Sequence, residues 1–277
     1  MYVIFSRHKS FHTLEFASNL LEPQKVPERL TTKINYKILI LILGLVIGLQ
    51  VYLSFATEEN SDLVETAVSV VNPLAASGAG FYVAKKYYNS EVFGKSYLVL
   101  AIGLLSMGLG EVTYAYYDFV LNQDPYPSIA DVFFFGFYPL AFYHITKNVR
   151  FFKAKIDIPT KILVVVLPIS IIGLYSYLSF QQIGEFNFDY YYGLVFISAS
   201  SLVLTAAIRG ARVFRQGLLG VAWLVLVIGI LLTTVGDVWY YYLETFDQYT
   251  LTHPVNLFWY ASYMVIAYAL YKHQNII

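Results

Sequence analysis

Two acidic residues lie inside long apolar stretches of this 277-residue chain, and they are the side chains best placed to do chemistry. Glu111 follows Gly110, Asp237 follows Gly236, and each pair continues as Val-x-Tyr. An ionised carboxylate in hydrocarbon is costly, so such acids face a bundle interior or a water-filled cavity and are candidates for function. Acid–base catalysis, proton transfer, switching and ligand binding are the chemistries open to them.

Helical spacing places each acid on one stripe with a tyrosine, because residues three, four and seven positions apart share a helix face. Two stripes have this spacing: Met107, Gly110, Glu111 and Tyr114, and Thr233, Gly236, Asp237 and Tyr240. The glycine before each acid leaves room for a neighbouring helix to approach closely. Both acids are therefore expected on inward faces.

The segment after each stripe adds a second polar position. Asp131 and Asn256 begin similar aromatic segments that reach a tyrosine two turns later. We predict one constellation of candidate ligand-binding residues: Glu111, Asp131, Asp237, Asn256, Tyr114, Tyr138, Tyr240 and Tyr263. Glu111 and Asp237 are its candidate catalytic groups. A structural interpretation is also open, in which Asp131 caps its helix and tyrosine hydroxyls bond the two acids to lock helices together.

The composition predicts a membrane protein. The chain is 58% hydrophobic and 13% charged, with a mean hydropathy of +0.58, and soluble domains rarely carry so little charge. The absence of cysteine excludes disulfides and Cys-ligated metals, and there is no His-Glu-x-x-His motif. No basic, aromatic-rich patch indicates nucleic acid. We expect membrane lipids as partners, no nucleic-acid partner, no metal and no cofactor.

The apolar runs predict an all-α, polytopic bundle of eight transmembrane helices, each near the length needed to cross a bilayer. Both the helix ends and the loops follow from these runs, and the loops are too short for a soluble domain. The expected helices are Lys37–Ala56, Asp62–Tyr87, Lys95–Asp118, Ile129–Lys147, Thr160–Phe180, Asp189–Val213, Gln216–Glu244 and Pro254–Lys272.

An internal duplication divides these helices into two sets of four. The segment 47–55 returns as 172–180 with seven of nine residues identical, and two further motifs recur at an offset of 126 residues. An even number of spans per repeat gives tandem repeats in parallel orientation. The expected organisation is an N-terminal segment (1–36), the first repeat (37–148), a basic linker (149–159), the second repeat (160–273) and a tail (274–277). The N-terminal segment is either an amphipathic surface helix or a cytoplasmic tail.

Charge orients the bundle. With these eight spans, all 18 Lys and Arg residues fall on one side. The loops on the other side contain acids and no basic residue. The positive-inside rule then predicts a multi-pass protein of the cell membrane with both termini in the cytoplasm.

Three further positions carry weaker signals. His144 and His273 lie near the inner ends of their spans but miss repeat alignment by about one turn, so we expect interfacial histidines and not a metal pair. Asn72-Pro73 interrupts the second expected span, and the freed carbonyl either shapes a cavity or kinks the helix. The second repeat has no proline at the matching point.

The segment Pro125-Tyr-Pro-Ser128-Ile-Ala-Asp131, followed by an aromatic run to Tyr138-Pro139, resembles a signature of bacterial multi-span membrane regions. Those regions often precede diguanylate cyclase (GGDEF) domains and are regarded as sensory input modules. The match covers the third and fourth expected helices, and a weaker similarity is found in the seventh and eighth. The sequence ends at Ile277 without an output domain. The resemblance therefore implies a stand-alone sensor that signals to a separate cytoplasmic or membrane partner.

The two Gly-acid pairs give a fainter resemblance to the lysoplasmalogenase (YhhN) family, which has about eight spans and paired Gly-Asp positions. That resemblance implies that Glu111 and Asp237 activate water against a lipid headgroup bond, with His144 as a matching histidine. This chain departs from the pattern by having Glu at 111.

Three functions follow from these patterns. We favour a non-enzymatic sensory or ligand-binding module with a polar site in the outer half of the bundle. The alternatives are an intramembrane lipid hydrolase, which needs two carboxylates within one water of each other, and a small proton- or cation-coupled transporter. The few polar residues on the inner side count against transport. Whether the repeats form one pocket or two stays open, as does the oligomeric state.

Overall fold

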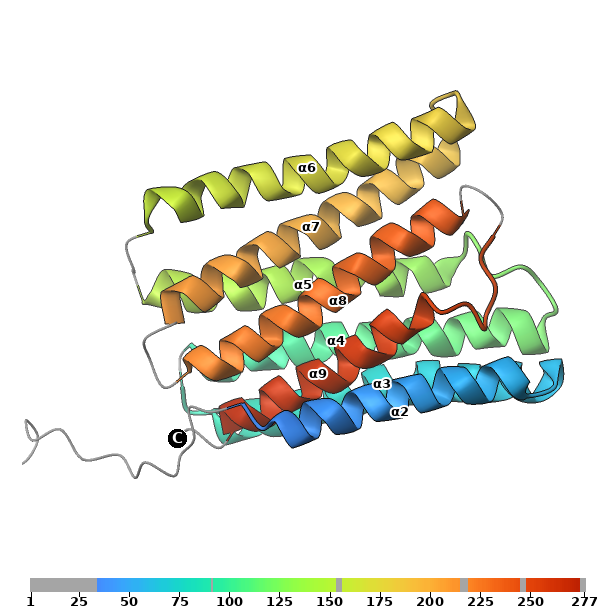
Figure 1. The fold of residues 1–277 in the computed structure, drawn as a ribbon. Helices are drawn as coiled ribbons and strands as arrows, with labels where there is room; N and C mark the ends of the chain where they lie inside the picture. Colours follow the sequence, from blue (N-terminus) through green and yellow to red (C-terminus); the bar gives the residue numbers. More distant parts are fainter. Residues whose placement is uncertain (1–33, 91, 153–155, 215–218, 245–247, 275–277) are drawn as a thin grey trace, which may run out of the picture. The chain divides into compact units, whose positions relative to one another are not determined.

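The computed structural model describes residues 34–90, 92–152, 156–214, 219–244 and 248–274. Within these ranges the chain forms eight long helices and one short π-helical turn, η1 (Figure 1). Their bounds are α2 (Tyr36–Phe55), α3 (Glu58–Lys86), α4 (Phe93–Ala115), η1 (Tyr116–Val120), α5 (Ile129–Phe151), α6 (Ile158–Ile183), α7 (Phe188–Phe214), α8 (Gly220–Glu244) and α9 (Asn256–Gln274). The amphipathic N-terminal helix considered from the sequence lies outside the described residues.

Each predicted helix overlaps one observed α-helix, and the differences are at the ends, where the third predicted helix (Lys95–Asp118) also covers part of η1. α3 begins at Glu58, earlier than predicted, and α5 continues to Phe151 through part of the expected linker. The interruption expected at Asn72-Pro73 is wrong, because α3 continues through Pro73. Proline is tolerated inside membrane helices where neighbouring groups satisfy the freed backbone.

Side chains define several helix ends. The Asn35 side chain accepts a hydrogen bond from the Lys37 backbone N–H at 3.1 Å and caps α2. Asp157 caps α6 in the same way through the Thr160 backbone N–H at 3.2 Å. An N-cap acceptor satisfies one of the free N–H groups of the first turn. Gly184 ends α6 with φ of 75°, a left-handed conformation that glycine adopts without steric cost.

Seven of the eight helices in the described ranges are long and apolar enough to cross a membrane, and α9 is the exception. The packing explains the exception. α9 contacts α8, α3 and α2, and it buries polar residues such as Asn256, Ser262 and His273. A helix enclosed by other helices does not need a lipid-facing apolar surface.

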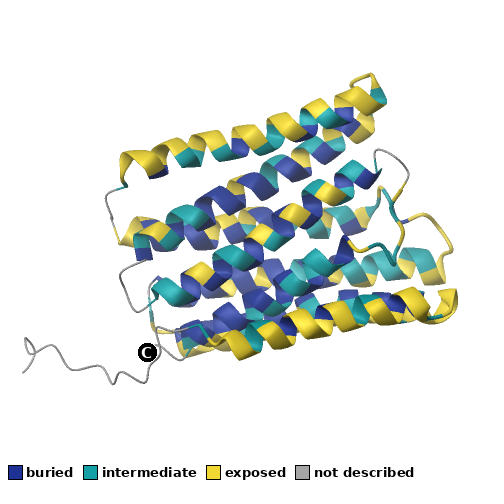
Figure 2. Cartoon of the chain, in the orientation of Figure 1, coloured by how far each residue is buried: buried dark blue, intermediate teal, exposed yellow. Residues whose placement is uncertain are grey.

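The bundle places α2 and α6 on its outside and α7 and α8 in its interior. Figure 2 shows α2 and α6 as largely exposed, whereas α7 and α8 are largely buried. The first set, α2 to α5, meets the second set, α6 to α9, where α3 contacts α9 and α5 contacts α7. The candidate residues of both sets therefore face a shared interior.

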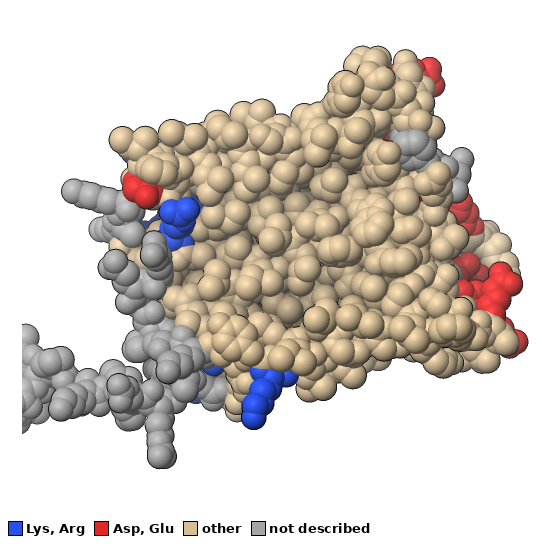
Figure 3. Space-filling view, viewed as in Figure 1, with Lys and Arg blue, Asp and Glu red and all other residues tan. Residues whose placement is uncertain are grey.

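The charged side chains separate between the two ends of the bundle. Lys and Arg side chains appear at one end of the visible face, and most acidic side chains appear at the other (Figure 3). We call the end with the α3–α4, α5–α6 and α7–α8 connections the basic end, and the opposite end the acid-rich end. Asp157, at the start of α6, is an acid at the basic end.

Candidate functional site

A cavity lies toward the acid-rich end, between the two sets of helices. Its volume is about 100 Å³, whereas one enclosed water needs about 10–15 Å³ on the same scale. The lining comes from α3, α4 and α5 of the first set and from α7, α8 and α9 of the second. Tyr126, Tyr249 and Leu251 add side chains from the loops at that end. The bundle therefore has room for several waters or a small ligand at the interface of the two sets.

All eight residues singled out from the sequence line this cavity. They come from four helices and both sets: Glu111, Tyr114, Asp131, Tyr138, Asp237, Tyr240, Asn256 and Tyr263. The structure thus brings the predicted constellation together around one cavity.

The glycines before the two acids allow the close helix packing that forms the site. A β-carbon on Gly110 would lie 2.5 Å from ring atoms of Phe134 on α5, and one on Gly236 would lie 2.9 Å from the Trp259 indole nitrogen on α9. Both distances are too short for a side chain to fit without movement of the aromatic neighbour. The sequence-based role of these glycines is borne out.

Asp237 is buried and fully hydrogen-bonded. Its Oδ2 accepts from the Tyr138 hydroxyl at 2.9 Å and from the Ser200 hydroxyl at 2.6 Å. Its Oδ1 accepts from the Trp259 indole N–H at 3.0 Å. These donors come from α5, α7 and α9, so Asp237 joins α8 to three other helices. Such bonding stabilises a buried carboxylate and fixes its orientation.

Glu111 lines the same cavity but differs in its bonding. No hydrogen-bond donor among the described residues reaches its carboxylate. Buried polar groups are usually hydrogen-bonded, so an acid without a protein partner requires an explanation. Water, a proton or a ligand in the cavity is what remains to interact with it.

The difference between the two acids follows from the residues around them. At an offset of 125 residues, the Trp259 that donates to Asp237 is matched by Phe134, which has no donor. Ser200 is matched at the same offset by Ala75, which has no hydroxyl. Tyr138 is matched by Tyr263, whose hydroxyl has no hydrogen bond among the described residues.

Asp131 combines the two roles that the sequence left open. Its Oδ2 accepts from the Ser128 backbone N–H at 2.7 Å, and the Ser128 side chain accepts from the Ala130 N–H. These contacts form a capping box that starts α5. Asp131 also lines the cavity. Capping fixes it at the cavity wall and leaves it available to a ligand.

Glu65 on α3 is a site residue that the sequence analysis missed. It is only 4% exposed and lines the cavity. Its Oε1 accepts hydrogen bonds from Tyr260 at 2.5 Å, Ser69 at 2.8 Å and Asn256 at 3.2 Å. The sequence does contain a signal, since Ser61, Glu65 and Ser69 recur every four residues along one helix face. The second set has no acid at the matching position, so a comparison of the two halves does not single out Glu65.

The loops contribute to the cavity lining without adding positive charge. Burial raises the pKa of Tyr126, so this lining phenol stays neutral. His253 lies in the α8–α9 loop, where burial lowers the pKa of its imidazole, and it is not a lining residue. The described lining contains four carboxylates, from Glu65, Glu111, Asp131 and Asp237, and no Lys, Arg or His. In the described part of the chain, no three His, Asp or Glu side chains are grouped to hold a metal ion.

His144 and His273 lie away from the cavity, toward the basic end, and the expectation of interfacial histidines is wrong. Both are buried, at 0% and 1% exposed. His144 Nδ1 lies 2.9 Å from the Ser96 carbonyl, and His273 Nδ1 lies 2.6 Å from the Tyr97 hydroxyl. The Tyr97 ring packs against both imidazoles. These histidines are part of a packed polar cluster within the bundle.

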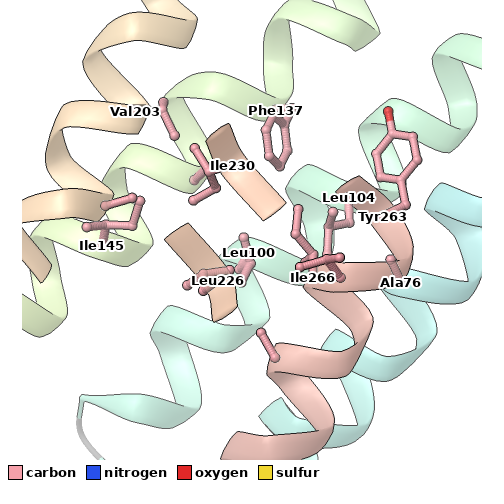
Figure 4. Close-up of a cluster of buried hydrophobic side chains, with 14 of the residues drawn as sticks. Ala76, Leu100, Leu104, Phe137, Ile145, Val203, Leu226, Ile230, Tyr263 and Ile266 are labelled. Carbon is pink, nitrogen blue, oxygen red and sulfur yellow. The ribbon is translucent and has the colours of Figure 1, made fainter. Parts of the chain in front are cut away.

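Along α4, α8 and α9, a layer of buried aliphatic residues lies between the positions of the histidine cluster and those of the cavity. Leu100, Leu104, Leu226, Ile230 and Ile266 meet there with Phe137 (Figure 4). Figure 4 also shows Tyr263 at the edge of the layer, with its hydroxyl oxygen directed away from these aliphatic side chains. The cavity and the histidine cluster are therefore distinct polar regions.

Comparison with known proteins identifies no relative. The sequence matches no protein-family model and no curated protein, and the fold matches no solved structure.

Proposed function

We propose that this chain is a membrane-embedded sensory or ligand-binding module whose ligand site is the cavity between the two helix sets. The observation that carries the proposal is Glu111, an acid that lines the cavity and has no donor among the described residues. An acid that only holds helices together is expected to resemble Asp237, which has both oxygens occupied. A ligand group supplies the partner that Glu111 lacks.

In this proposal all eight helices cross the cell membrane and the basic end faces the cytoplasm. The separation of charges in Figure 3 supports this orientation. α9, with 19 residues, is about 28 Å long, close to the thickness of the hydrocarbon core. The cavity then lies toward the outer leaflet.

We also infer that α2–α5 and α6–α9 are tandem repeats in parallel orientation. Matching contacts support the inference. Gly110 packs against Phe134 as Gly236 packs against Trp259. The contact of α3 with α9 has a counterpart in the contact of α7 with α5.

The two alternative functions receive less support from the geometry. A hydrolase would need a carboxylate pair free to activate water, but both oxygens of Asp237 accept hydrogen bonds. His144, the residue that the lysoplasmalogenase resemblance would require, does not line the cavity. A transporter would need a polar route to the basic end, where the layer in Figure 4 lies. The resemblance to sensory input regions remains compatible, since its Ser128 and Asp131 form the capping box at the cavity wall.

The test is to identify what co-purifies with the protein from native membranes. Wild type is compared with Glu111→Gln, and with Glu59→Gln as a control, because Glu59 is exposed at the acid-rich end and does not line the cavity. We expect one ligand, detected by native mass spectrometry, to be retained by wild type and Glu59→Gln and lost from Glu111→Gln. Equal retention by all three proteins, or no ligand in any, would contradict the proposal.

The sensory part of the proposal has its own test. Deletion of the protein, or Glu111→Gln in its place, should alter a signalling output that depends on a separate partner. A protein that binds its ligand through Glu111 but leaves every such output unchanged would be a binding module without a sensory role.

A further inference from the structure

The charge of the cavity lining is one-sided. Glu65, Glu111, Asp131 and Asp237 line it, and the described lining has no Lys, Arg or His to balance them. Protein hydrogen bonds stabilise three of these carboxylates, but none reaches Glu111. An ionised carboxylate at low dielectric attracts a cation strongly. An anionic ligand is disfavoured for the same reason.

The walls of the cavity are aromatic. Tyr240 stands edge-on to two other lining rings, with centroids 4.8 Å from Tyr249 and 5.4 Å from Trp259. Interplanar angles of 85° and 62° set the Tyr240 ring at a steep angle to each of them. Tyr114 and Tyr126 extend the aromatic lining. Aromatic faces attract cations through the ring quadrupole, and several rings around one space form the cages that recognise alkylammonium groups.

Tyr263 is an independent indication that the cavity takes a ligand. The residue is 3% exposed and lines the cavity. Its hydroxyl has no hydrogen bond among the described residues. Tyr263 and Glu111, which come from different helix sets, therefore both leave polar atoms available to a cavity occupant.

The lining favours an organic cation over a metal ion. A hard divalent cation needs about six or more oxygen ligands at short distance, and no group of three acidic or histidine side chains in the described ranges can hold one. An alkylammonium group needs one or two carboxylates and aromatic faces instead. The cavity of about 100 Å³ holds several waters and so has room for such a group.

We infer that the cavity binds an alkylammonium group, with the Glu111 carboxylate as its counter-ion and the rings of Tyr240, Tyr249 and Trp259 as its walls. The inference rests on the proposed ligand-binding function and names the class of ligand. The group is either a free small cation or the headgroup of a lipid.

The experiment uses the full chain in a maltoside detergent, which contributes no ammonium group. Choline and its neutral isostere 3,3-dimethyl-1-butanol are titrated by isothermal calorimetry at constant ionic strength. Tryptophan emission serves as a second signal, because Trp259 lines the cavity. We expect choline to bind at least tenfold more tightly than the isostere. Equal or tighter binding of the isostere would overturn the inference.

Variants test the assigned groups. Glu111→Gln should weaken choline binding at least tenfold, while Glu111→Asp, which keeps the charge, should retain it within about threefold. Glu59→Gln controls for long-range electrostatic attraction of choline by the acids at the acid-rich end, and it should leave choline binding unchanged. Tyr240→Leu should weaken binding more than Tyr240→Phe, which keeps the aromatic face. Unchanged binding in Glu111→Gln overturns the assignment, as does loss of binding in Glu59→Gln to the same extent.

A lipid arm separates the two sources of the group. If the headgroup is the ligand, lysophosphatidylcholine should displace choline at a lower concentration than free choline requires, and lysophosphatidylglycerol should not. If the free cation is the ligand, neither lipid should compete. A neutral or anionic ligand that co-purifies in a Glu111-dependent way would overturn the ammonium inference while the proposed function stands. The absence of any Glu111-dependent ligand would overturn both.

Discussion

Asp237 and Glu111 hold corresponding places in the two helix sets, yet they have opposite surroundings. Asp237 accepts hydrogen bonds from Tyr138, Ser200 and Trp259, whereas Glu111 has no donor among the described residues. The backbone frame is similar in both places, since each acid follows a glycine that packs against an aromatic ring. One helix set therefore uses its acid to hold the bundle together, whereas the acid of the other set faces the cavity without a protein donor.

The largest expected effect comes from removing the bonded acid. Asp237→Ala removes the acceptor of the Tyr138, Ser200 and Trp259 donors, and with about 0.6–1.7 kcal/mol for each hydrogen bond in a membrane protein we expect a loss of about 2–5 kcal/mol. Glu111→Ala removes no hydrogen bond to a described residue and should cost less than about 1 kcal/mol. Denaturant unfolding in one detergent measures both. Equal losses would contradict the division of roles.

A second comparison concerns the polar residues that start α5 and α9. Asn256→Asp places a carboxylate beside Glu65, whose Oε1 now accepts from the Asn256 amide at 3.2 Å. Repulsion and the lost donor should destabilise the protein by about 1–2 kcal/mol. The reciprocal change, Asp131→Asn, keeps an oxygen that accepts from the Ser128 N–H and should be close to neutral. A neutral Asn256→Asp in the same unfolding assay would show that Glu65 is not ionised there.

A third change gives Glu111 the donor that Asp237 has. Phe134→Trp places an indole where the second set has Trp259, so we expect a gain in stability of about 1 kcal/mol and weaker ligand binding, because the indole N–H competes for the carboxylate. Val132→Trp is the matched control, since Val132 is exposed on the same helix. Ligand binding that survives Phe134→Trp unchanged would show that Glu111 is not the contact.

Much of the fold could be predicted because apolar length and charge are local properties of the sequence. All eight helices were found in this way, and the inward face of Glu111 and Asp237 followed from helical spacing. The enclosed position of α9 could not be predicted from the sequence. Its low hydropathy is explained by its contacts with α2, α3 and α8, which depend on tertiary packing. The same holds for His144 and His273, whose burial depends on tertiary packing.

The residues around the cavity were predicted, but the difference in hydrogen bonding between Glu111 and Asp237 was not. Trp259, Ser200 and Glu65 lie on three helices, and their meeting with Asp237 or Asn256 depends on how the sets pack. A comparison of the two helix sets in sequence finds positions at which they carry similar residues. It does not find donors that occur in only one set, and these are the residues that make the two acids differ.

The smallest expected effect concerns the caps of the first helix in each set, Asn35 on α2 and Asp157 on α6. Hydrogen bonding from Thr160 lowers the pKa of Asp157 below its ordinary value of 3.8. A carboxyl whose pKa is depressed in the folded state stabilises the protein above its unfolded-state pKa, and this contribution is lost as pH falls through the folded value. Between about pH 5 and about pH 3, wild type should lose more stability than Asp157→Asn, whose cap does not titrate. Asn35→Asp should add the same acid sensitivity to α2, measured as the pH dependence of the melting temperature. If the melting temperatures of Asp157→Asn and wild type depend on pH in the same way, the charge of Asp157 does not contribute to stability. The caps of α2 and α6 would then stabilise their helices through hydrogen bonding alone.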